Sequence, residues 1–360
     1  MHFAWMGLGL VFLVAGAEGL VRGASKLALS LGISPLVVGL TIVAFGTSAP
    51  EMAVSVEAAR SGQVDIALGN VVGSNIFNVL FILGISAMIA PLVVNAQLIR
   101  QEVPVMIAAS LLLFALAADG GISRVDGVLF VLMLLAYTTF LVLESRRETR
   151  ATKKEFAEEF AEPTGAGWDR HWGVQVALVL GGLALLVLGA RWLVESSVAI
   201  AIALGVSELV VGLTIVAAGT SLPEVATSIV ATIRGERDIA VGNVVGSNSF
   251  NILGVLGLSA TLAPTELPVA TSLLLFDVPI MTAVALACLP VFLTGRTIER
   301  WEGAVFLAYY AGYTGYLVLA AQRYEGLPVL SDAMAWFVVP LMLVTLVSSL
   351  VSDAKARRRA

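Results

Sequence analysis

Two glutamates lie deep inside long apolar stretches of this 360-residue chain. Glu51 falls within the apolar stretch 35–59 and Glu224 within the stretch 209–233, and neither stretch contains a lysine or an arginine. An ionised carboxylate at the centre of a bilayer is costly unless it is paired or hydrated. Because no basic side chain shares these stretches, we expect a bound cation or a proton to neutralise each carboxylate.

Hydroxyl and amide groups accompany both glutamates at helical spacing. Thr47 and Ser48 precede Glu51 by four and three residues, so a helix turns the three side chains toward nearly one face. The second glutamate has the same companions. The predicted ion ligands are the side chains of Thr47, Ser48, Glu51, Ser74, Asn78, Thr220, Ser221, Glu224, Ser247 and Asn251, with the backbone carbonyls of Ala44 and Ala217, which we expect helix breaks to free.

These predicted ligands are all hard oxygen donors. Calcium takes about six to eight such oxygens in a flexible arrangement. One cysteine and two histidines are too few for a thiolate or imidazole site that would hold a soft metal. One divalent ion or two monovalent ions would neutralise the two carboxylates, and a third monovalent ion would make exchange move charge. Since two ionised carboxylates repel each other, protons should compete with the metal.

The composition indicates what kind of scaffold positions these groups. Hydrophobic residues make up 58% of the chain and charged residues only 13%, which is too little polarity for an ordinary water-exposed surface. We therefore predict an all-α polytopic protein of the cell (inner) membrane, surrounded by the lipid bilayer. Spans of about 20 residues leave only short loops. This excludes a large soluble catalytic domain, and we expect no enzyme activity, no cofactor and no nucleic-acid partner.

The sequence contains an internal repeat. Residues 39–51 (GLTIVAFGTSAPE) match residues 212–224 (GLTIVAAGTSLPE) at 11 of 13 positions, and residues 65–78 (DIALGNVVGSNIFN) match residues 238–251 (DIAVGNVVGSNSFN) at 12 of 14, with the same offset of 173. Each copy contains five apolar stretches, an odd number, so the second copy enters the membrane from the opposite side. Inverted repeats are typical of secondary transporters, which bind substrate near the midplane between interrupted helices.

The apolar stretches divide the chain into four segments. Residues 1–143 form a first five-helix repeat, 144–172 a charged linker, 173–320 a second, inverted five-helix repeat, and 321–360 a further apolar stretch with a basic tail. The further stretch, 335–351, either spans the membrane as an eleventh helix or is an interfacial or packing helix. The ten predicted spans are 3–21, 35–59, 66–90, 103–118, 126–143, 173–194, 209–233, 239–262, 272–293 and 301–320.

The basic residues predict the orientation of these spans. With the amino terminus outside, 17 of the 21 lysines and arginines fall on the cytoplasmic side, six of them in the linker. Membrane proteins carry such an excess of basic residues in their cytoplasmic loops. We therefore expect an external amino terminus and a cytoplasmic linker.

The repeated motifs resemble those of a known superfamily. Two GTS-x-PE segments, each followed by GN-VV-GSN-x-FN, resemble the α-repeats of the cation/calcium exchangers, especially the prokaryotic sodium/calcium exchangers, over residues 1 to about 320. The resemblance implies that the side chains named above bind ions, and that the first and sixth spans slide over a compact core. Some relatives, including those that also move potassium, have Asp where this chain has Asn251, so the resemblance does not favour potassium coupling.

We therefore expect a secondary antiporter that exchanges sodium for calcium by alternating access. Proton/calcium antiport is the alternative, because the same carboxylates can accept protons. A cation channel is disfavoured, since channels usually arrange rings of subunits around a pore. An intramembrane hydrolase is disfavoured because both histidines lie near the ends of spans.

Structural interpretations compete with some of these assignments. The threonine and serine hydroxyls could bond back to the preceding helical turn, and the Ser and Asn of the second motif could join neighbouring helices. Asn70, Asn75, Asn243 and Asn248 are interpreted as helix caps or breaks, and Asp65 and Asp238 as helix caps. Glu102 and Asp277 could cap helices or line an access path, and capping is favoured. The charges of Glu18 and Arg22 are reversed in their repeat-related positions Arg191 and Glu195, which indicates interface pairing at helix ends.

Overall fold

The computed structural model of the chain describes residues 2–31, 33–147, 171–204 and 217–321. Most of the predicted linker, the start of the seventh predicted span, and the stretch 335–351 with the basic tail lie outside the described residues. The described part is helical apart from four strands of two residues each and short connections.

The first half begins with a long helix and continues through shorter helices that follow one another with little or no loop. Its elements are α1 (His2–Leu31), α2 (Pro35–Val38), η1 (Gly39–Val43), α3 (Ala44–Thr47), α4 (Ala49–Arg60), α5 (Val64–Phe77), η2 (Asn78–Leu83), α6 (Gly84–Ile89), β1 (Leu92–Val93), η3 (Leu98–Glu102), α7 (Val103–Leu116), η4 (Ala117–Asp119), β2 (Gly121–Ile122) and α8 (Arg124–Arg147).

The second half repeats this order. Its described elements are α10 (Trp172–Ala203), α12 (Ala217–Gly219), α13 (Leu222–Ile233), α14 (Arg237–Phe250), η7 (Asn251–Leu256), α15 (Gly257–Leu262), β3 (Leu267–Pro268), η8 (Leu273–Asp277), α16 (Val278–Leu293), β4 (Thr297–Ile298) and α17 (Arg300–Ala321). Among the elements labelled η, η4 is a 3-10 turn and the other five are π-helical segments that continue into α-helix.

Eight of these helices, counted through their π-helical segments, are long and apolar enough to cross a membrane within the described residues. A ninth span results if Pro35–Thr47 and Ala49–Arg60, which meet at a bend of 47°, are taken as one. The prediction of a predominantly helical, multi-span membrane protein is therefore confirmed. The largest difference in length is at α1, predicted to end near residue 21, which continues to Leu31.

The bend near the middle of the second span has a local cause. Ser48 separates α3 from α4, and α4 has Pro50 in its first turn. Proline lacks a backbone N–H and its ring clashes with the preceding turn, so it is tolerated at a helix start but interrupts a continuous helix. Ser221 and Pro223 repeat the arrangement at the start of α13. Each predicted glutamate therefore lies in the first turn of a new helix.

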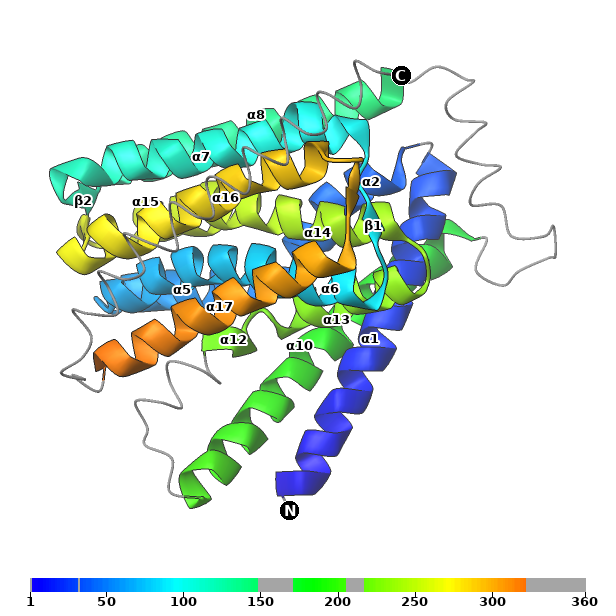
Figure 1. The fold of residues 1–360 in the computed structure, drawn as a ribbon, viewed down its shortest axis with the longest axis horizontal. Coiled ribbons are helices and arrows are strands. Elements are labelled where there is room, and N and C mark those ends of the chain that lie inside the picture. The colour runs from blue at the N-terminus through cyan, green and yellow to red at the C-terminus, as the bar shows by residue number, and fades with distance from the viewer. Residues whose placement is uncertain (1, 32, 148–170, 205–216, 322–360) are drawn as a thin grey trace.

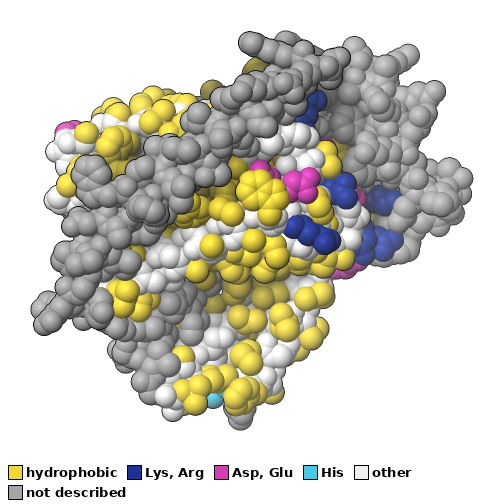
Figure 2. All heavy atoms as spheres, viewed as in Figure 1, with side chains coloured by type: hydrophobic (Ala, Val, Ile, Leu, Met, Phe, Trp, Pro, Cys, Tyr) yellow, Lys and Arg dark blue, Asp and Glu magenta, His cyan; other side chains and the backbone are white. Residues whose placement is uncertain are grey.

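The helices differ in how deeply they are buried. The most apolar window of Arg237–Leu262, which comprises α14, η7 and α15, is 100% buried, and that of Val64–Ile89 is 72% buried. The corresponding windows in α8 and α17 are only 17% and 11% buried, so these helices lie at the periphery. In Figure 2 hydrophobic side chains cover much of the visible described face, while lysine and arginine gather at the right of the view.

The two long helices α1 and α10 form a separate pair. They pack side by side and run obliquely to the other helices, as Figure 1 shows. At 30 and 32 residues they are about 45 Å long, well above the thickness of a bilayer core. Glycines set their close contact, because a Cβ added at Gly16 would lie 2.7 Å from the carbonyl oxygen of Gly182, and one at Gly189 equally close to that of Gly9.

Two small antiparallel strand pairs join the halves. Leu92 pairs with Ile298 and Val93 with Thr297 in β1 and β4, while β2 pairs with β3. In each pair one strand comes from the first half and the other from the second. The loops of the core are therefore connected across the two halves by backbone hydrogen bonds.

Candidate ion-binding site

The helix breaks bring the two predicted glutamates into contact with serines of the opposite half. Ser221 donates a hydrogen bond to Glu51 Oε1 over 2.7 Å, and Ser48 donates one to Glu224 Oε1 over 3.0 Å. Both glutamates are only 1% exposed. Each also lies in the first turn of its helix, where the positive end of the helix dipole favours a carboxylate.

The predicted threonines bond to asparagines of the opposite half. Thr47 donates to Asn243 Oδ1 over 3.1 Å, and Thr220 donates to Asn70 Oδ1 over 3.2 Å. Thr47 also lies 3.4 Å from the carbonyl oxygen of Ala44, so the bond across the halves is the shorter of its two contacts. Back-bonding to the preceding turn is thus the weaker contact of Thr47.

The capping interpretation of Asn70 and Asn243 is wrong. Both residues lie inside helices, α5 and α14, and their amide groups reach the neighbouring broken helix. Asn70 donates to Ser55 Oγ over 2.9 Å and to the carbonyl oxygen of Glu51 over 3.3 Å. Asn243 makes the corresponding bonds to Ser228 Oγ and to the Glu224 carbonyl, over 3.1 and 3.5 Å. These asparagines therefore fix the helices that carry the carboxylates.

A second asparagine pair lies where α5 meets α14. Asn75 donates to the backbone carbonyl of Asn248, and Asn248 donates to that of Asn75, both over 3.2 Å. The predicted ligands Asn78 and Asn251 donate to the side-chain oxygens of Asn248 and Asn75, over 3.0 and 3.1 Å. Their amide nitrogens are thus occupied within the protein, which leaves their side-chain oxygens available as acceptors.

The remaining predicted ligands have less uniform surroundings. Ser74 Oγ lies 3.2 Å from Ser221 Oγ, whose one hydroxyl proton goes to Glu51, so Ser221 acts as the acceptor in this second contact. The counterpart of Ser74, Ser247, is fully buried with no hydrogen-bond partner. The expectation that the break frees the Ala44 carbonyl is wrong, because the backbone N–H of Ser48 donates to it over 3.0 Å. Its second lone pair remains, and its role as a ligand stays a prediction. Ala217 begins α12.

Several buried oxygens at this centre have no hydrogen-bond donor. They are Glu51 Oε2, Glu224 Oε2, Asn78 Oδ1, Asn251 Oδ1 and Ser247 Oγ. Buried polar atoms in proteins are almost always paired, because an unpaired one costs free energy. Four of the five are carboxylate or amide oxygens, which are the ligands that hard cations such as calcium and sodium prefer. The set therefore fits a partly or fully dehydrated hard cation as substrate.

Negative charge at this centre is confined to the two carboxylates. Nowhere in the described ranges do three or more His, Cys, Asp or Glu side chains converge. Two carboxylates together with several neutral oxygens have the charge to neutralise one divalent cation or two monovalent cations.

The other acidic residues noted in the sequence lie elsewhere. Asp65 and Asp238 are in the first turns of α5 and α14 but do not cap them, since the N-cap positions are Gln63 and Glu236. Glu102 accepts hydrogen bonds from Tyr137 and Gln97, and Asp277 accepts one from Tyr313 over 2.8 Å. The capping prediction is therefore wrong for Asp65 and Asp238. Glu102 and Asp277 do stand at the N-cap positions of α7 and α16, but neither side chain makes a capping hydrogen bond. Glu102 and Asp277 instead join the fourth helix of each half to the fifth.

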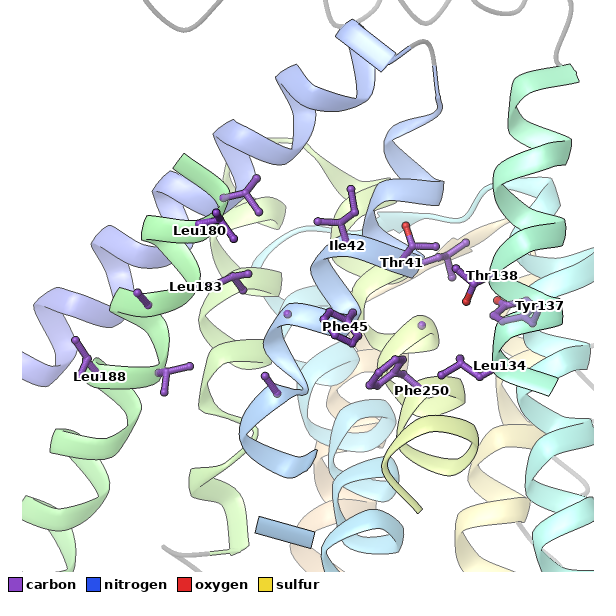
Figure 3. A pocket seen from close by; sticks show the side chains of 17 residues that line it. Thr41, Ile42, Phe45, Leu134, Tyr137, Thr138, Leu180, Leu183, Leu188 and Phe250 are labelled. Atoms are coloured by element: carbon purple, nitrogen blue, oxygen red, sulfur yellow. The ribbon is translucent and has the colours of Figure 1, made fainter. Parts of the chain in front are cut away.

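A large apolar groove lies beside the candidate site. It encloses about 760 Å³ between α10, α8, α14 and the broken helix. Phe45 and Phe250 meet edge to face within it, with ring centroids 5.1 Å apart (Figure 3). Its labelled lining includes Leu180, Leu183 and Leu134. The groove offers few ligands to an ion, and it separates α10 from α8.

Comparison with known proteins identifies the family of the chain. The family model described as "sodium/calcium exchanger protein" matches residues 1–143 and 174–319. The chain is 42% identical over 314 residues to "putative antiporter CaxA" of Alkalimonas amylolytica, covering 85% of this chain and 95% of that one. It is 36% identical over 342 residues to "sodium/calcium exchanger MaX1" of Methanosarcina acetivorans, covering 87% and 97%.

Solved structures show the same fold. A structure of the sodium-calcium exchanger NCX_Mj soaked with 10 mM Na⁺ and zero Ca²⁺ superposes with a TM-score of 0.73 at 29% identity, covering 89% of this chain and 98% of that one. Another relative, "inner membrane protein YrbG" of Escherichia coli, is 40% identical over 269 residues, which cover 74% of this chain and 81% of that one. The chain is therefore a multi-pass membrane protein of the sodium/calcium exchanger family, a family of transporters rather than enzymes.

Proposed function

We propose that this protein is a secondary antiporter that exchanges sodium for calcium by alternating access. The observation that carries the proposal is the crossed pair of buried carboxylates, each bonded to a serine of the opposite half and each with one unpaired oxygen. The proposed ligands are the oxygens of Ala44, Thr47, Ser48, Glu51, Ser74, Asn78, Ala217, Thr220, Ser221, Glu224, Ser247 and Asn251.

The proposed scaffold is ten spans in two inverted five-helix repeats. Its segments are 1–143, a linker at 144–172, 173–320, and 321–360. Reciprocal contacts support the repeat, because adding or subtracting 173 turns the Ser48–Glu224 bond into the Ser221–Glu51 bond and the Thr47–Asn243 bond into the Thr220–Asn70 bond. The β1–β4 and β2–β3 pairs are exchanged in a similar way. A two-fold axis in the membrane plane accounts for both observations.

The proposed location is the cell (inner) membrane, with the amino terminus outside and the linker in the cytoplasm. The distribution of basic residues supports this orientation. In it, α13 leads from the site toward the cytoplasm and α4 leads toward the outside.

The proposed coupling follows from charge. Either one calcium ion or two sodium ions neutralise the charge of the two carboxylates. The two kinds of ion therefore compete for the same site. An empty site would leave two buried negative charges unpaired, which is costly in a membrane core. The protein with a loaded site can therefore switch its opening from one side of the membrane to the other at a low free-energy cost, whereas the protein with an empty site cannot. This requirement couples the fluxes of the two ions.

Proton/calcium antiport is the second candidate. The unpaired oxygens of Glu51 and Glu224 are the observation that favours it, since a buried carboxylate can be neutralised by a proton as well as by a metal. Only a transport measurement with one counter-ion at a time separates the two candidates.

The test is radioactive calcium flux in liposomes that contain the purified protein. Sodium, potassium or protons would supply the only counter-ion gradient. We expect uptake driven by sodium and none driven by potassium. Uptake driven equally well by a pH gradient without sodium would support the second candidate, and flux that needs no counter-ion gradient would contradict antiport.

The variants for this test are Glu51→Gln and Glu224→Gln, which keep the size of the side chain and remove its charge. We expect each to abolish calcium flux. Glu57→Gln is the matched control, because Glu57 lies on the same helix α4 but is exposed. Ordinary exchange in either site variant would contradict the proposed site.

A further inference from the structure

The two halves differ in how the helix that leads away from the site is covered. In α13, Thr227 follows Glu224 by three residues and is 0% exposed. The residue in the equivalent position of α4 is Val54, which is 40% exposed. The helix α1 packs along α13, whereas no comparable packing joins α10 to α4 in the described ranges. The structure is therefore closed along α13 and more open along α4.

A charge pair lies at the closed interface. Arg234, at the end of α13, donates a hydrogen bond from Nε to Glu18 Oε2 of α1 over 2.6 Å. The sequence suggested that Glu18 pairs at a helix end, and the structure identifies Arg234 as a partner. This ion pair connects the α1–α10 helix pair to the core.

At the repeat-related positions that the structure describes, the other half has no equivalent ion pair. The repeat relates Glu18 to Arg191 and Arg234 to Ser61. Arg191 instead bonds Glu195 of its own helix over 2.7 Å, and Ser61 donates to the backbone carbonyl of Glu57 over 2.8 Å. Neither contact joins α10 to α4. Among the described residues, the ion pair between α1 and α13 thus has no counterpart between α10 and α4.

An inverted repeat offers two arrangements in which the halves exchange roles. If the halves were identical, the two arrangements would have equal free energy, so any preference comes from contacts made in only one of them. We propose that Glu18 and Arg234 are positioning residues whose ion pair favours the arrangement in which α1 covers α13. This proposal rests on the function proposed above and on the orientation proposed with it.

The pair is suited to a reversible contact. Both side chains are partly exposed, at 42% for Glu18 and 40% for Arg234. A small cavity of about 70 Å³ adjoins them, lined by Arg22, Ser25, Lys26, Arg234 and Glu236 among others. Exposed ion pairs contribute little, which corresponds to a change of up to about fivefold in an equilibrium between two arrangements. The pair therefore biases the equilibrium without preventing the exchange of roles.

The first experiment measures the calcium concentration for half-maximal exchange separately on each side of the membrane. Glu18→Gln and Arg234→Gln should populate the arrangement that is open along α13. We expect tighter apparent affinity on the cytoplasmic side and weaker apparent affinity outside, each by up to about fivefold. The reversed pair, Glu18→Arg with Arg234→Glu, should return both values toward those of the unaltered protein.

Arg191→Gln is the matched control, because it removes the ion pair at the repeat-related position of α10. It should leave both apparent affinities unchanged.

An independent readout is the reaction of a Val54→Cys thiol with a membrane-impermeant reagent added outside, which should slow when Glu18→Gln is added. Native Cys288 is buried and should not interfere.

Two results would overturn the inference while leaving the proposed function in place. One is normal exchange in both Glu18→Gln and Arg234→Gln, with no shift in apparent calcium affinity on either side and no change in Val54→Cys labelling. The other is a shift that the reversed pair fails to restore. Absence of sodium/calcium exchange in the unaltered protein would instead contradict the proposed function.

Discussion

At the scale of single residues, the site consists of contacts that each half makes with the other. Ser48 and Ser221 donate to carboxylates that lie 176 and 170 residues away in the chain. A hydrogen bond to an ionised carboxylate is stronger than one between neutral groups. Each serine therefore holds one oxygen of the opposite carboxylate in place, while its own oxygen is a proposed ligand.

We predict that Ser48→Ala and Ser221→Ala weaken apparent calcium affinity by about tenfold or more, since a hydrogen bond to a charged group is worth about 1.5–3 kcal/mol. The two changes should have similar effects, because they are repeat-related. Calcium-dependent flux measured across a range of calcium concentrations checks this. A large effect in only one variant would show that the halves do not contribute equally.

The repeated motifs allowed most of these side chains to be predicted from the sequence. Asn70 and Asn243 were missed as parts of the network, because their partners Thr220 and Thr47 are remote in the chain and an asparagine beside glycine is typical of a helix cap. A signal was present, since both asparagines belong to the repeated GN-VV-GSN motif. The prediction of a free Ala44 carbonyl was wrong for another reason. The backbone hydrogen bonds of α3 continue as far as Ser48, whose N–H donates to that carbonyl.

At the scale of helices and strands, the apolar stretches predicted the spans well, since a membrane span is specified by length and hydropathy. The strands were not predicted, because two residues are too few to show a pattern. Helix α1 was predicted too short, since Arg22 and Lys26 end the apolar run but not the helix. Lysine and arginine are good helix formers, so a helix can continue past the point where its apolar run ends.

We predict that Gly182→Ala disrupts the α1–α10 pair, because its Cβ would lie 2.7 Å from the Gly16 carbonyl oxygen. Overpacking of this kind costs about 1–3 kcal/mol. Gly181→Ala is the control, since a Cβ there meets nothing within 4 Å and alanine favours helix. Thermal unfolding in detergent should show a lower midpoint for Gly182→Ala only. Equal midpoints for both variants would contradict the close packing.

At the scale of the whole molecule, the inverted repeat predicts that equivalent turns lie on opposite sides of the membrane. The turn between α4 and α5 contains Gly62 with φ of 80°, and the turn between α13 and α14 contains Gly235 with φ of 79°. Glycine adopts this left-handed conformation without strain. The two turns therefore have the same backbone course and, under the proposed topology, opposite locations.

We predict that Ser61→Cys reacts with an impermeant thiol reagent only from outside, and Arg237→Cys only from the cytoplasm. Both positions are exposed. Intact cells and inside-out membrane vesicles provide the two measurements. Labelling of both cysteines from the same side would contradict the inverted topology, and exchanged sides would reverse the orientation.

The two strand pairs restrict which parts of the molecule can travel. Because β1–β4 and β2–β3 each connect loops of different halves, separating the halves of the core would break backbone hydrogen bonds in both places. Under the proposed function, we therefore expect the core to stay together during transport. Neither α1 nor α10 belongs to a strand pair, and glycine contacts tie these helices to each other. Under the proposed function, α1 and α10 would move together as a pair, and the core residues that they contact would decide where the movement stops.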